Sequence, residues 1–333
     1  MNDSESISQV EAESGAKPLI RRSLVVPIYR NAENIPDLIK AIENLNRFLG
    51  PGFEIIFVID GSPDTSAELL VEAAKQLPCT STIAFHSRNF GSFTAIRTGL
   101  ELARGNYFAT MAADLQEPPE LIINFFEVLS TDKADIVFGQ RIGRGDSPLH
   151  SLASALFWWG YRKLVLPDLP QGGVDVFACN RQVRDVILSI TEPNSSLIAQ
   201  LFWIGFRRSF VPYIRRRRQH GRSAWNFSRR FRYMMDSIFS YSDTPILVVL
   251  WVGVFGCLVS IALGLITMIA RLLDLIREPG YTTLMIIGLF YGSTLLVVQG
   301  IIGCYLWRAF ENTKRRPLRI ISHVISAKGK PHD

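Results

Sequence analysis

Short runs of hydrophobic residues alternate with longer amphipathic segments between residue 21 and about residue 140. Five of these runs predict buried strands, at 24–28, 54–59, 82–85, 107–111 and 136–138. Segments 35–49 and 93–103, which lie between strands, predict helices. Strands separated by helices favour a mostly parallel sheet with right-handed crossovers, so the pattern predicts an α/β domain.

Two later segments, 244–270 and 279–307, contain no charged residue. Each is longer than the roughly 20 residues that a helix needs to cross a bilayer. Two buried helices of a water-soluble protein are the alternative, but soluble helices of this length without a polar face are rare. We therefore expect two transmembrane helices within 244–308, joined by a short outer loop at 271–280.

Two other segments combine basic residues with hydrophobic residues at every third or fourth position, at about 148–165 and at 229–243. Such segments are typical of helices that lie in the membrane interface, and core-facing amphipathic helices are the alternative. The predicted organisation is a disordered acidic tail at 1–20, an α/β domain at 21–228 that includes the first amphipathic helix, an interfacial helix at 229–243, the two spans, and a basic tail at 309–333.

Composition adds little beyond the membrane segments. The mean hydropathy of +0.17 is high for a soluble protein, and the two uncharged segments account for it. The four cysteines are dispersed without CxxC spacing, which indicates neither a zinc site nor a disulfide framework. Residues 1–18 are polar and acidic and contain no cleavable signal peptide.

The net charge of +6 comes from basic residues on both sides of the uncharged segments, so nucleic acid is not the expected partner. The run 215–218 and Arg222 precede the first segment, and Arg308 and 314–316 follow the second. Because positive residues mark the cytoplasmic side, we expect a multi-pass inner (plasma) membrane protein with its α/β domain and both termini in the cytoplasm. Anionic headgroups or a phosphorylated lipid are the expected partners.

The first candidate site follows the predicted strand 107–111, where Asp114 and Gln116 precede a pair of prolines that can open a helix. Ligands of open α/β sheets collect outside the carboxyl ends of the strands. An acid and an amide two residues apart supply oxygens that suit Mg²⁺ or Mn²⁺ held together with phosphate oxygens. In isolation, a solvated turn would explain the same residues.

A second candidate site follows strand 54–59, where Asp60-Gly61-Ser62 forms a tight turn with a carboxylate free to accept from a base N–H or a ribose hydroxyl. Segment 87–91 enters the next helix, whose amino terminus can face phosphate. Neither a GxGxxG motif nor a Walker loop is present, so dinucleotide and P-loop sites lose their main support.

Together these motifs resemble glycosyltransferase family 2, and within it the polyprenyl-phosphate glycosyltransferases, relatives of dolichol-phosphate mannosyltransferase and of bacterial undecaprenyl-phosphate glucosyltransferases. The resemblance covers about residues 22–320, and its order and spacing are specific. Its motifs are Val26-Pro27-Ile28-Tyr29, Asp60-Gly61-Ser62-Pro63-Asp64, Arg88-Asn89-Phe90-Gly91, Asp114-Leu115-Gln116, Gly139-Gln140-Arg141, Val211-Pro212-Tyr213 and Gly221-Arg222-Ser223.

The resemblance implies roles for individual residues. Nucleotide-sugar binding falls to Pro27, Tyr29, Asp60, Arg88, Asn89, Gly91 and Asp114. The implied ligands of the divalent cation, Mg²⁺ or Mn²⁺, are Asp114 and Gln116. Catalytic roles fall to Asp175, Arg141, Arg215 and Arg218, and the acceptor lipid phosphate falls to Arg215, Arg218 and Ser223.

Asp175 matches the family's carboxylate on the acceptor side. A lipid monophosphate has a second pKa of about 6 and is already an anionic nucleophile at neutral pH, so Asp175 needs mainly to orient the sugar or acceptor. For any one arginine of 215–218, a solvated or headgroup-facing patch is the alternative.

The chain also departs from the family pattern. Ala112 and Ile59 stand where the family commonly has aspartate, Ala224 where it frequently has lysine, and Cys304 where it usually has glutamate. The missing carboxylate at position 112 removes a potential metal or ribose ligand.

The resemblance implies a GT-A-type, mostly parallel α/β domain followed by interfacial helices and two transmembrane helices. We expect inverting transfer of one hexose from a nucleotide sugar, with UDP-glucose favoured, to a polyprenyl phosphate. A GDP-mannose-dependent mannosyltransferase and a catalytically silent scaffold are alternatives; a processive polysaccharide synthase would usually carry a Gln-x-x-Arg-Trp motif, which the sequence lacks. A homo-oligomer is left open.

Overall fold

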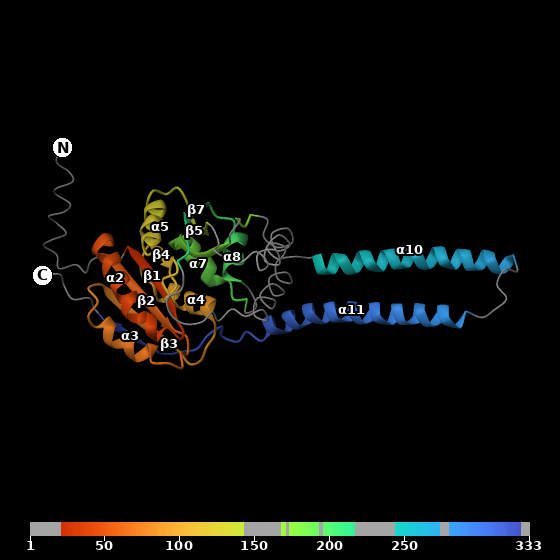
Figure 1. Cartoon of the computed structure of the whole chain (residues 1–333), viewed down its shortest axis with the longest axis horizontal. Helices are drawn as coiled ribbons and strands as arrows, with labels where there is room; N and C mark the ends of the chain where they lie inside the picture. The colour runs from red at the N-terminus through yellow and green to blue at the C-terminus, as the bar shows by residue number, and fades with distance from the viewer. Residues whose placement is uncertain are drawn as a thin grey trace.

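The computed structural model describes residues 21–142, 168–170, 173–192, 196–216, 244–273 and 280–327. Within these residues, eight strands form one sheet in the order β7-β5-β6-β4-β1-β2-β3-β8. The strands are β1 (Arg22–Ile28), β2 (Phe53–Ile59), β3 (Thr80–His86), β4 (Tyr107–Thr110), β5 (Ile136–Arg141), β6 (Val174–Asn180), β7 (Arg208–Tyr213) and β8 (Ile321–Ala327). Helices cover both faces of the sheet (Figure 1).

The described residues also form one 3-10 helix and eight α-helices. They are η1 (Ala32–Asn34), α2 (Ile35–Leu49), α3 (Ser66–Ala74), α4 (Ser92–Leu102), α5 (Glu120–Ser130), α7 (Arg181–Ser189), α8 (Leu197–Trp203), α10 (Thr244–Leu272) and α11 (Tyr281–Thr313). The five predicted strands and both predicted helices of the α/β domain are confirmed, with ends that differ by at most three residues.

The sheet is mostly parallel, as predicted. Strand β1 pairs in parallel with β2 and β4, β2 pairs in parallel with β3, and β5 pairs in parallel with β7. Strand β6 runs antiparallel between β4 and β5. The carboxyl ends of β4, β1, β2, β5 and β7 therefore meet at the same edge of the sheet as the amino end of β6.

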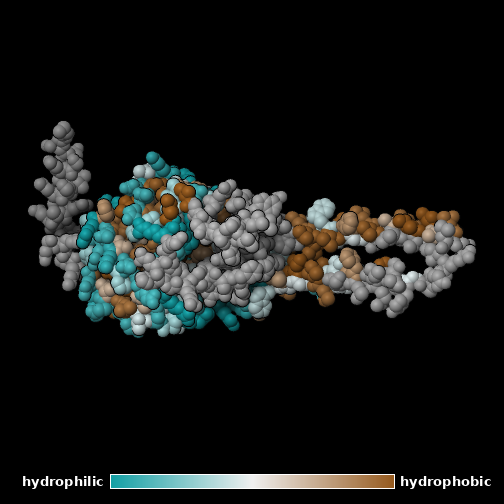
Figure 2. Space-filling view, in the orientation of Figure 1, coloured by the Kyte–Doolittle hydropathy of each residue, from teal (hydrophilic) through white to brown (hydrophobic). Residues whose placement is uncertain are grey.

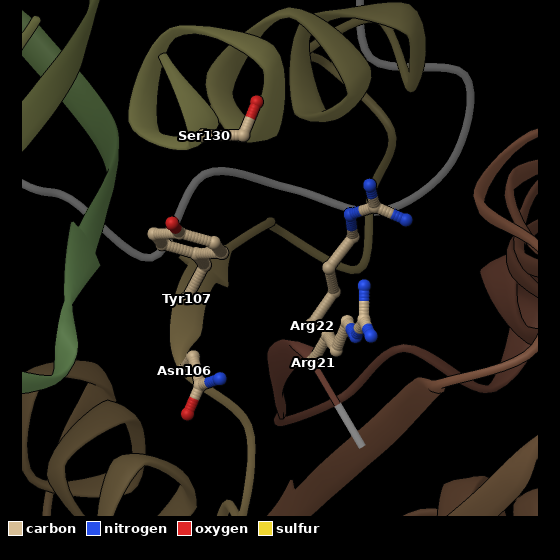
Figure 3. Close-up of a pocket in the computed structure, with 5 residues that line it drawn as sticks. All are labelled: Arg21, Arg22, Asn106, Tyr107 and Ser130. Carbon is tan, nitrogen blue, oxygen red and sulfur yellow. The ribbon is translucent and has the colours of Figure 1, made fainter. Parts of the chain in front are cut away.

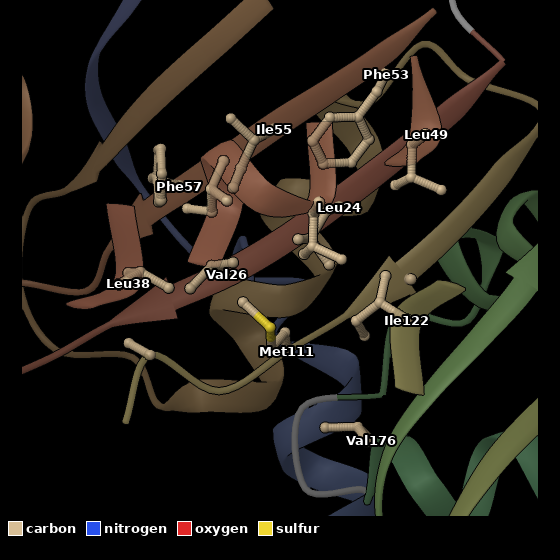
Figure 4. Packing of buried hydrophobic residues seen from close by; sticks show 14 of the residues in the cluster. Leu24, Val26, Leu38, Leu49, Phe53, Ile55, Phe57, Met111, Ile122 and Val176 are labelled. Carbon is tan, nitrogen blue, oxygen red and sulfur yellow. The ribbon is translucent and has the colours of Figure 1, made fainter. Parts of the chain in front are cut away.

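Successive residues of the central strands alternate between two hydrophobic cores, which explains their continuous hydrophobic sequences. On one face, Leu24 and Val26 of β1 pack with Leu38 of α2 and Ile122 of α5 (Figure 4). On the other face, Val25 packs in a separate cluster beneath α4, α7 and α8. The central strands are thus buried on both sides.

Helices α10 and α11 run side by side and extend away from the α/β domain (Figure 1). Large hydrophobic side chains are exposed along them, including Trp251, Phe255 and Leu296, each more than two-thirds exposed. Figure 2 shows this hydrophobic surface beside the largely hydrophilic α/β domain. In the described part of the chain, Phe290–Thr313 is long and apolar enough to cross a membrane, while the apolar stretch in α10 is the shorter Ile246–Gly256. The second span stays a prediction.

The chain returns to the sheet after α11, which the sequence did not predict. Strand β8 lies within the expected basic tail and pairs antiparallel with β3. The amide of Ser87 donates a 3.0 Å hydrogen bond to the carbonyl of Ile320, and Arg319 forms an ion pair with Glu101 of α4. The segment that follows α11 is therefore part of the α/β domain.

Candidate active site

Loops at the carboxyl edge of the sheet carry most of the residues that the sequence singled out. Tyr29 follows β1, Asp60 follows β2 and Asp114 follows β4, while Arg141 ends β5 and Asp175 lies at the start of β6. The parallel strands and the reversed direction of β6 bring these residues to one edge, which is where open α/β sheets bind ligands.

Asp60 organises the loop that precedes α4. Its side chain is only 3% exposed, and Oδ1 lies 2.8 Å from Nδ1 of His86. Oδ1 also accepts a 2.8 Å hydrogen bond from the Phe90 amide, and Oδ2 accepts one of 2.8 Å from the Gly91 amide. The expectation of a free carboxylate is therefore wrong, because the protein's own groups already surround it. Direct contact between Asp60 and a nucleotide stays a prediction.

Gly61 allows this loop to approach the turn after β2. Its φ is +58°, and a Cβ at this position would lie 2.4 Å from the carbonyl carbon of Arg88 and 2.5 Å from the Asn89 nitrogen. Only glycine fits such an approach. The Asn89 side-chain amide also donates a 3.3 Å hydrogen bond to the Asp60 carbonyl. Arg88 and Asn89 are thus held against the turn that begins at Asp60.

Asp64 ties the loop after β1 to the loop after β2. Its Oδ1 accepts hydrogen bonds from the hydroxyls of Ser62 (2.5 Å) and Ser66 (2.7 Å), and its Oδ2 accepts a 3.2 Å hydrogen bond from the Ala32 amide. Burial alone would raise the pKa of Asp64, but these hydrogen bonds lower it below its ordinary value. The ionised carboxylate therefore links the two loops at neutral pH.

Pro27 and Tyr29 lie half-buried at the end of β1, beside this linked pair of loops. The Tyr29 amide donates a 3.1 Å hydrogen bond to Oδ1 of Asn31, and the Arg30 guanidinium lies 5.4 Å from the centre of the Tyr29 ring. These contacts fix the backbone, and the predicted contact of Pro27 and Tyr29 with a nucleotide sugar is not tested by them.

Asp114 and Gln116 share one tight turn after β4. Leu115 between them has a φ of +52°, and the Gln116 amide donates a 3.3 Å hydrogen bond to Oδ1 of Asp114. Nη2 of Arg215 donates a 2.7 Å hydrogen bond to Oε1 of Gln116. The two predicted metal ligands are therefore neighbours, and one of them already contacts a positively charged group.

Asp175 is surrounded by three donors. Its Oδ2 accepts a 2.9 Å hydrogen bond from the Tyr213 hydroxyl and a 3.4 Å hydrogen bond from Nη1 of Arg141, and it lies 3.6 Å from Nη1 of Arg215. Arg215 thus bridges Gln116 and Asp175. The structure brings together four residues that the sequence predicted to act at the donor diphosphate or the acceptor: Arg141, Asp175, Arg215 and Gln116.

Two further residues of this cluster, Tyr213 and Glu117, were missed as site residues. Burial and the nearby carboxylates of Asp175 and Glu117 raise the pKa of Tyr213, so it remains a hydrogen-bond donor. Burial, reinforced by Asp114 and Asp175, raises the pKa of Glu117 to about 7. Tyr213 could have been found from its place beside Arg215 in a family motif, whereas nothing in the sequence pattern marks Glu117 as buried.

The residues of the turn fit a divalent cation. No group of three or more acidic, histidine or cysteine side chains is arranged to hold a metal in the described parts of the chain. However, Oε2 of Glu117 is buried without a hydrogen-bond partner among the described residues, next to Asp114. Mg²⁺ is commonly held by one or two carboxylates together with substrate phosphates. The donor set of Asp114, Gln116 and a diphosphate agrees with that chemistry.

Some predicted features lie outside the described residues. They are Arg218, Ser223 and the amphipathic segments at about 148–165 and 229–243. A pocket lined by Arg21, Arg22, Asn106, Tyr107 and Ser130 lies at the amino ends of β1 and β4 (Figure 3). That is the opposite edge of the sheet, and we assign this pocket no part in the site.

Comparison with known proteins identifies the family of this chain. The model of the family "Glycosyl transferase family 2" matches residues 23–240. The undecaprenyl-phosphate 4-deoxy-4-formamido-L-arabinose transferase of Pseudomonas paraeruginosa is 30% identical over 93% of this chain and 92% of its own length. The bactoprenol glucosyl transferase of Shigella phage SfV is 29% identical over 90% of this chain and 98% of its own length.

Among solved structures, a mannosyltransferase from Pyrobaculum calidifontis in complex with GDP-Man and Mn²⁺ is similar to this chain. It is 15% identical, the match covers 86% of this chain and 87% of that one, and the TM-score is 0.44.

Proposed function

The chain belongs to glycosyl transferase family 2 and is a glycosyltransferase, and on that premise we propose that it transfers one hexose from a nucleotide sugar to a polyprenyl phosphate. The acceptor class follows from the relatives, which act on undecaprenyl phosphate or bactoprenol according to their names. UDP-glucose is the favoured donor, because one relative is named a glucosyl transferase.

The observation that carries the proposal is the Arg215 bridge between Gln116 and Asp175. It joins the turn suited to a donor diphosphate to the carboxylate expected on the acceptor side. Arginine forks bind phosphate oxygens well, so Arg141 and Arg215 are suited to hold the phosphates of donor and acceptor next to each other.

The proposed reaction is a direct displacement that inverts the anomeric carbon. A phosphate oxygen of the acceptor forms the new bond to that carbon, and the bond from the carbon to the donor diphosphate breaks, which releases a nucleoside diphosphate. Because the acceptor phosphate is already anionic, Asp175 orients the sugar or the acceptor and need not remove a proton. The Tyr213 hydroxyl holds the Asp175 carboxylate in place.

Developing charge on the leaving diphosphate requires cationic groups. A divalent cation held by Asp114 and Gln116 would neutralise part of this charge when bound. Arg215 supplies a fixed positive charge at the same turn. The loop that Asp60 organises precedes the amino end of α4, but its Phe90 and Gly91 amides already donate to the Asp60 carboxylate, so these two amides are not assigned to donor phosphate.

The fold also supports an even number of membrane crossings. Strand β7 precedes α10 and β8 follows α11, yet both are strands of one sheet. A chain that leaves the side of the membrane on which the sheet lies must return to it before Ile321. If Phe290–Thr313 crosses the membrane, a second crossing must precede it, and α10 is the described helix that can provide it.

The basic residues at the domain ends of these helices favour a cytoplasmic α/β domain. There the acceptor phosphate would lie at the headgroup level while its polyprenyl chain stays in the lipid. Anionic lipid headgroups would then contact the same basic flanks.

Incubation of the purified full-length protein with undecaprenyl phosphate and a panel of UDP- and GDP-hexoses tests the function. We expect one nucleotide sugar, UDP-glucose first, to give a glycosylated lipid. Selective use of GDP-mannose would favour the mannosyltransferase alternative. Failure of every donor, with folded protein, would favour the silent scaffold that Ala112 and Ile59 suggest.

A further inference from the structure

Glu117 is a buried polar residue of the site, and the proposed reaction assigns it no role. It is 2% exposed, and Oε2 has no hydrogen-bond partner among the described residues. A buried acceptor without a partner is costly, roughly 1–3 kcal/mol and more when it is charged. Such a group indicates that a partner arrives when the site is filled.

The charges around Glu117 call for a cation. Asp114, Asp175 and Arg215 are its charged neighbours: burial and the two carboxylates raise the pKa of Glu117, and the guanidinium lowers it. The guanidinium of Arg215 is directed to Gln116 and Asp175, so it does not satisfy Oε2 of Glu117. Among the described residues, this cluster holds the carboxyl groups of Asp114, Glu117 and Asp175 and the guanidinium groups of Arg141 and Arg215, and a bound diphosphate would add further negative charge.

The position of Glu117 in the chain places it on the same turn as both predicted metal ligands. The Leu115 amide donates a 3.4 Å hydrogen bond to the carbonyl of Ala112, which closes a turn that contains Asp114, and Gln116 and Glu117 follow this turn directly. Ala112 itself provides no carboxylate.

We infer that Glu117 provides a carboxylate ligand to the divalent cation of the proposed transferase site, in place of the acid that position 112 lacks. This inference rests on the proposed function for the identity of the bound diphosphate. Asp114, Glu117 and the amide oxygen of Gln116 then supply the protein's oxygens, and the diphosphate completes the coordination.

Binding of Mn²⁺ to the purified full-length protein in detergent, with UDP present, tests the inference. The EPR signal of free Mn²⁺ gives the Kd. We expect Glu117→Gln to weaken Mn²⁺ binding by at least about tenfold. The matched control is Glu120→Gln, because Glu120 lies three residues away with a side chain that is 71% exposed, and this variant should bind Mn²⁺ as the unmodified protein does.

A rescue variant separates a ligand from a residue that only supports the fold. The double variant Ala112→Asp/Glu117→Gln has a new carboxylate on the other side of Asp114 in the sequence. We expect this double variant to recover most of the Mn²⁺ affinity that Glu117→Gln loses. Thermal unfolding of each variant measures the folded fraction. Weakened binding in a protein that stays folded supports the inference.

Two results would overturn it. One is an unchanged Mn²⁺ Kd in Glu117→Gln, which would favour an ion pair of Glu117 with Arg215, whose buried Nε also lacks a partner among the described residues. The other is weakened binding that comes with loss of folded protein and that Ala112→Asp does not restore. Sugar transfer by a protein that binds no Mn²⁺ would refute the inference alone, whereas UDP-dependent Mn²⁺ binding without transfer to any lipid would refute the proposed function alone.

Discussion

The amide of Ser87 donates a 3.0 Å hydrogen bond to the carbonyl of Ile320, and so joins the loop after β3 to the segment that follows α11. The ring of His323 stacks on Phe85 at 4.0 Å in the adjoining strand pair. The segment that follows α11 is therefore built into the same sheet as the loop at 87–91, so both lie on the same side of any membrane that α10 and α11 cross.

This arrangement predicts the accessibility of two positions. A cysteine that replaces Gly280, between α10 and α11, should react with a membrane-impermeant thiol reagent in intact cells. A cysteine that replaces Ser326 of β8 should react only after the membrane is permeabilised, since its position is exposed on the domain. The unmodified protein controls for the native cysteines, and labelling of the Ser326→Cys variant in intact cells would reverse the proposed orientation.

The close approach at Gly61 predicts a selective effect of an added methyl group. Gly61→Ala would bring Cβ to 2.4 Å from the Arg88 backbone and displace the loop at 87–91, which we propose lies at the nucleotide sugar, so the KM for the nucleotide sugar should rise several-fold. Gly50→Ala is the matched control, because Gly50 also has a positive φ (+68°) but nothing within 4 Å of the added Cβ. Equal KM values for the two variants would show that the Gly61 contact does not position the loop.

The hydrogen bond between Tyr213 and Asp175 predicts a loss of turnover. Tyr213→Phe removes the donor and keeps the ring, and a hydrogen bond to a charged group contributes about 1.5–3 kcal/mol, so kcat should fall by about ten- to a hundredfold. The KM for the nucleotide sugar should change little. Tyr107→Phe, at the opposite edge of the sheet, is the control, and a similar kcat in both variants would contradict a role for Tyr213 in orienting Asp175.

The turn after β4 predicts a charge requirement at Asp114. Asp114→Asn keeps the shape of the side chain and removes its charge, so the protein should stay folded but lose most of its activity, by several kcal/mol of transition-state stabilisation. Asp132→Asn is the control, because the Asp132 side chain is 87% exposed and is not part of the candidate site. Near-normal turnover of Asp114→Asn with saturating Mg²⁺ or Mn²⁺ would exclude Asp114 as a ligand.

The central strands could be predicted from the sequence because they are buried on both faces and read as continuous hydrophobic runs. Strand β6, although it lies inside the sheet, and the outer strands β7 and β8 were not predicted. Strand β8 exposes most of its residues and is stabilised by pairing with β3, a contact between distant parts of the chain that no local pattern reveals. Strand β7 is half-buried or exposed at every position except the buried Tyr213, and it contains a proline, as edge strands do.

The candidate site shows the same division. Asp114, Gln116, Arg141, Asp175 and Arg215 could be named from motifs, and the sheet topology brings them to one edge. The motifs do not reveal which of these side chains already form hydrogen bonds or ion pairs within the protein. Asp60 was expected to be free, but His86 and two backbone amides surround its carboxylate. Glu117 was overlooked, because burial without a partner is a property of the packed structure.

The composition of the lipid product tests the central claim most directly. If the acceptor phosphate attacks the anomeric carbon, mass spectrometry of the product should show a single phosphorus atom in the glycosylated lipid, with UDP or GDP as the released nucleotide. A phosphosugar transferase would attack at phosphorus and give a lipid diphosphate together with UMP or GMP. Two phosphorus atoms in the lipid, or a nucleoside monophosphate as the main nucleotide, would contradict the account.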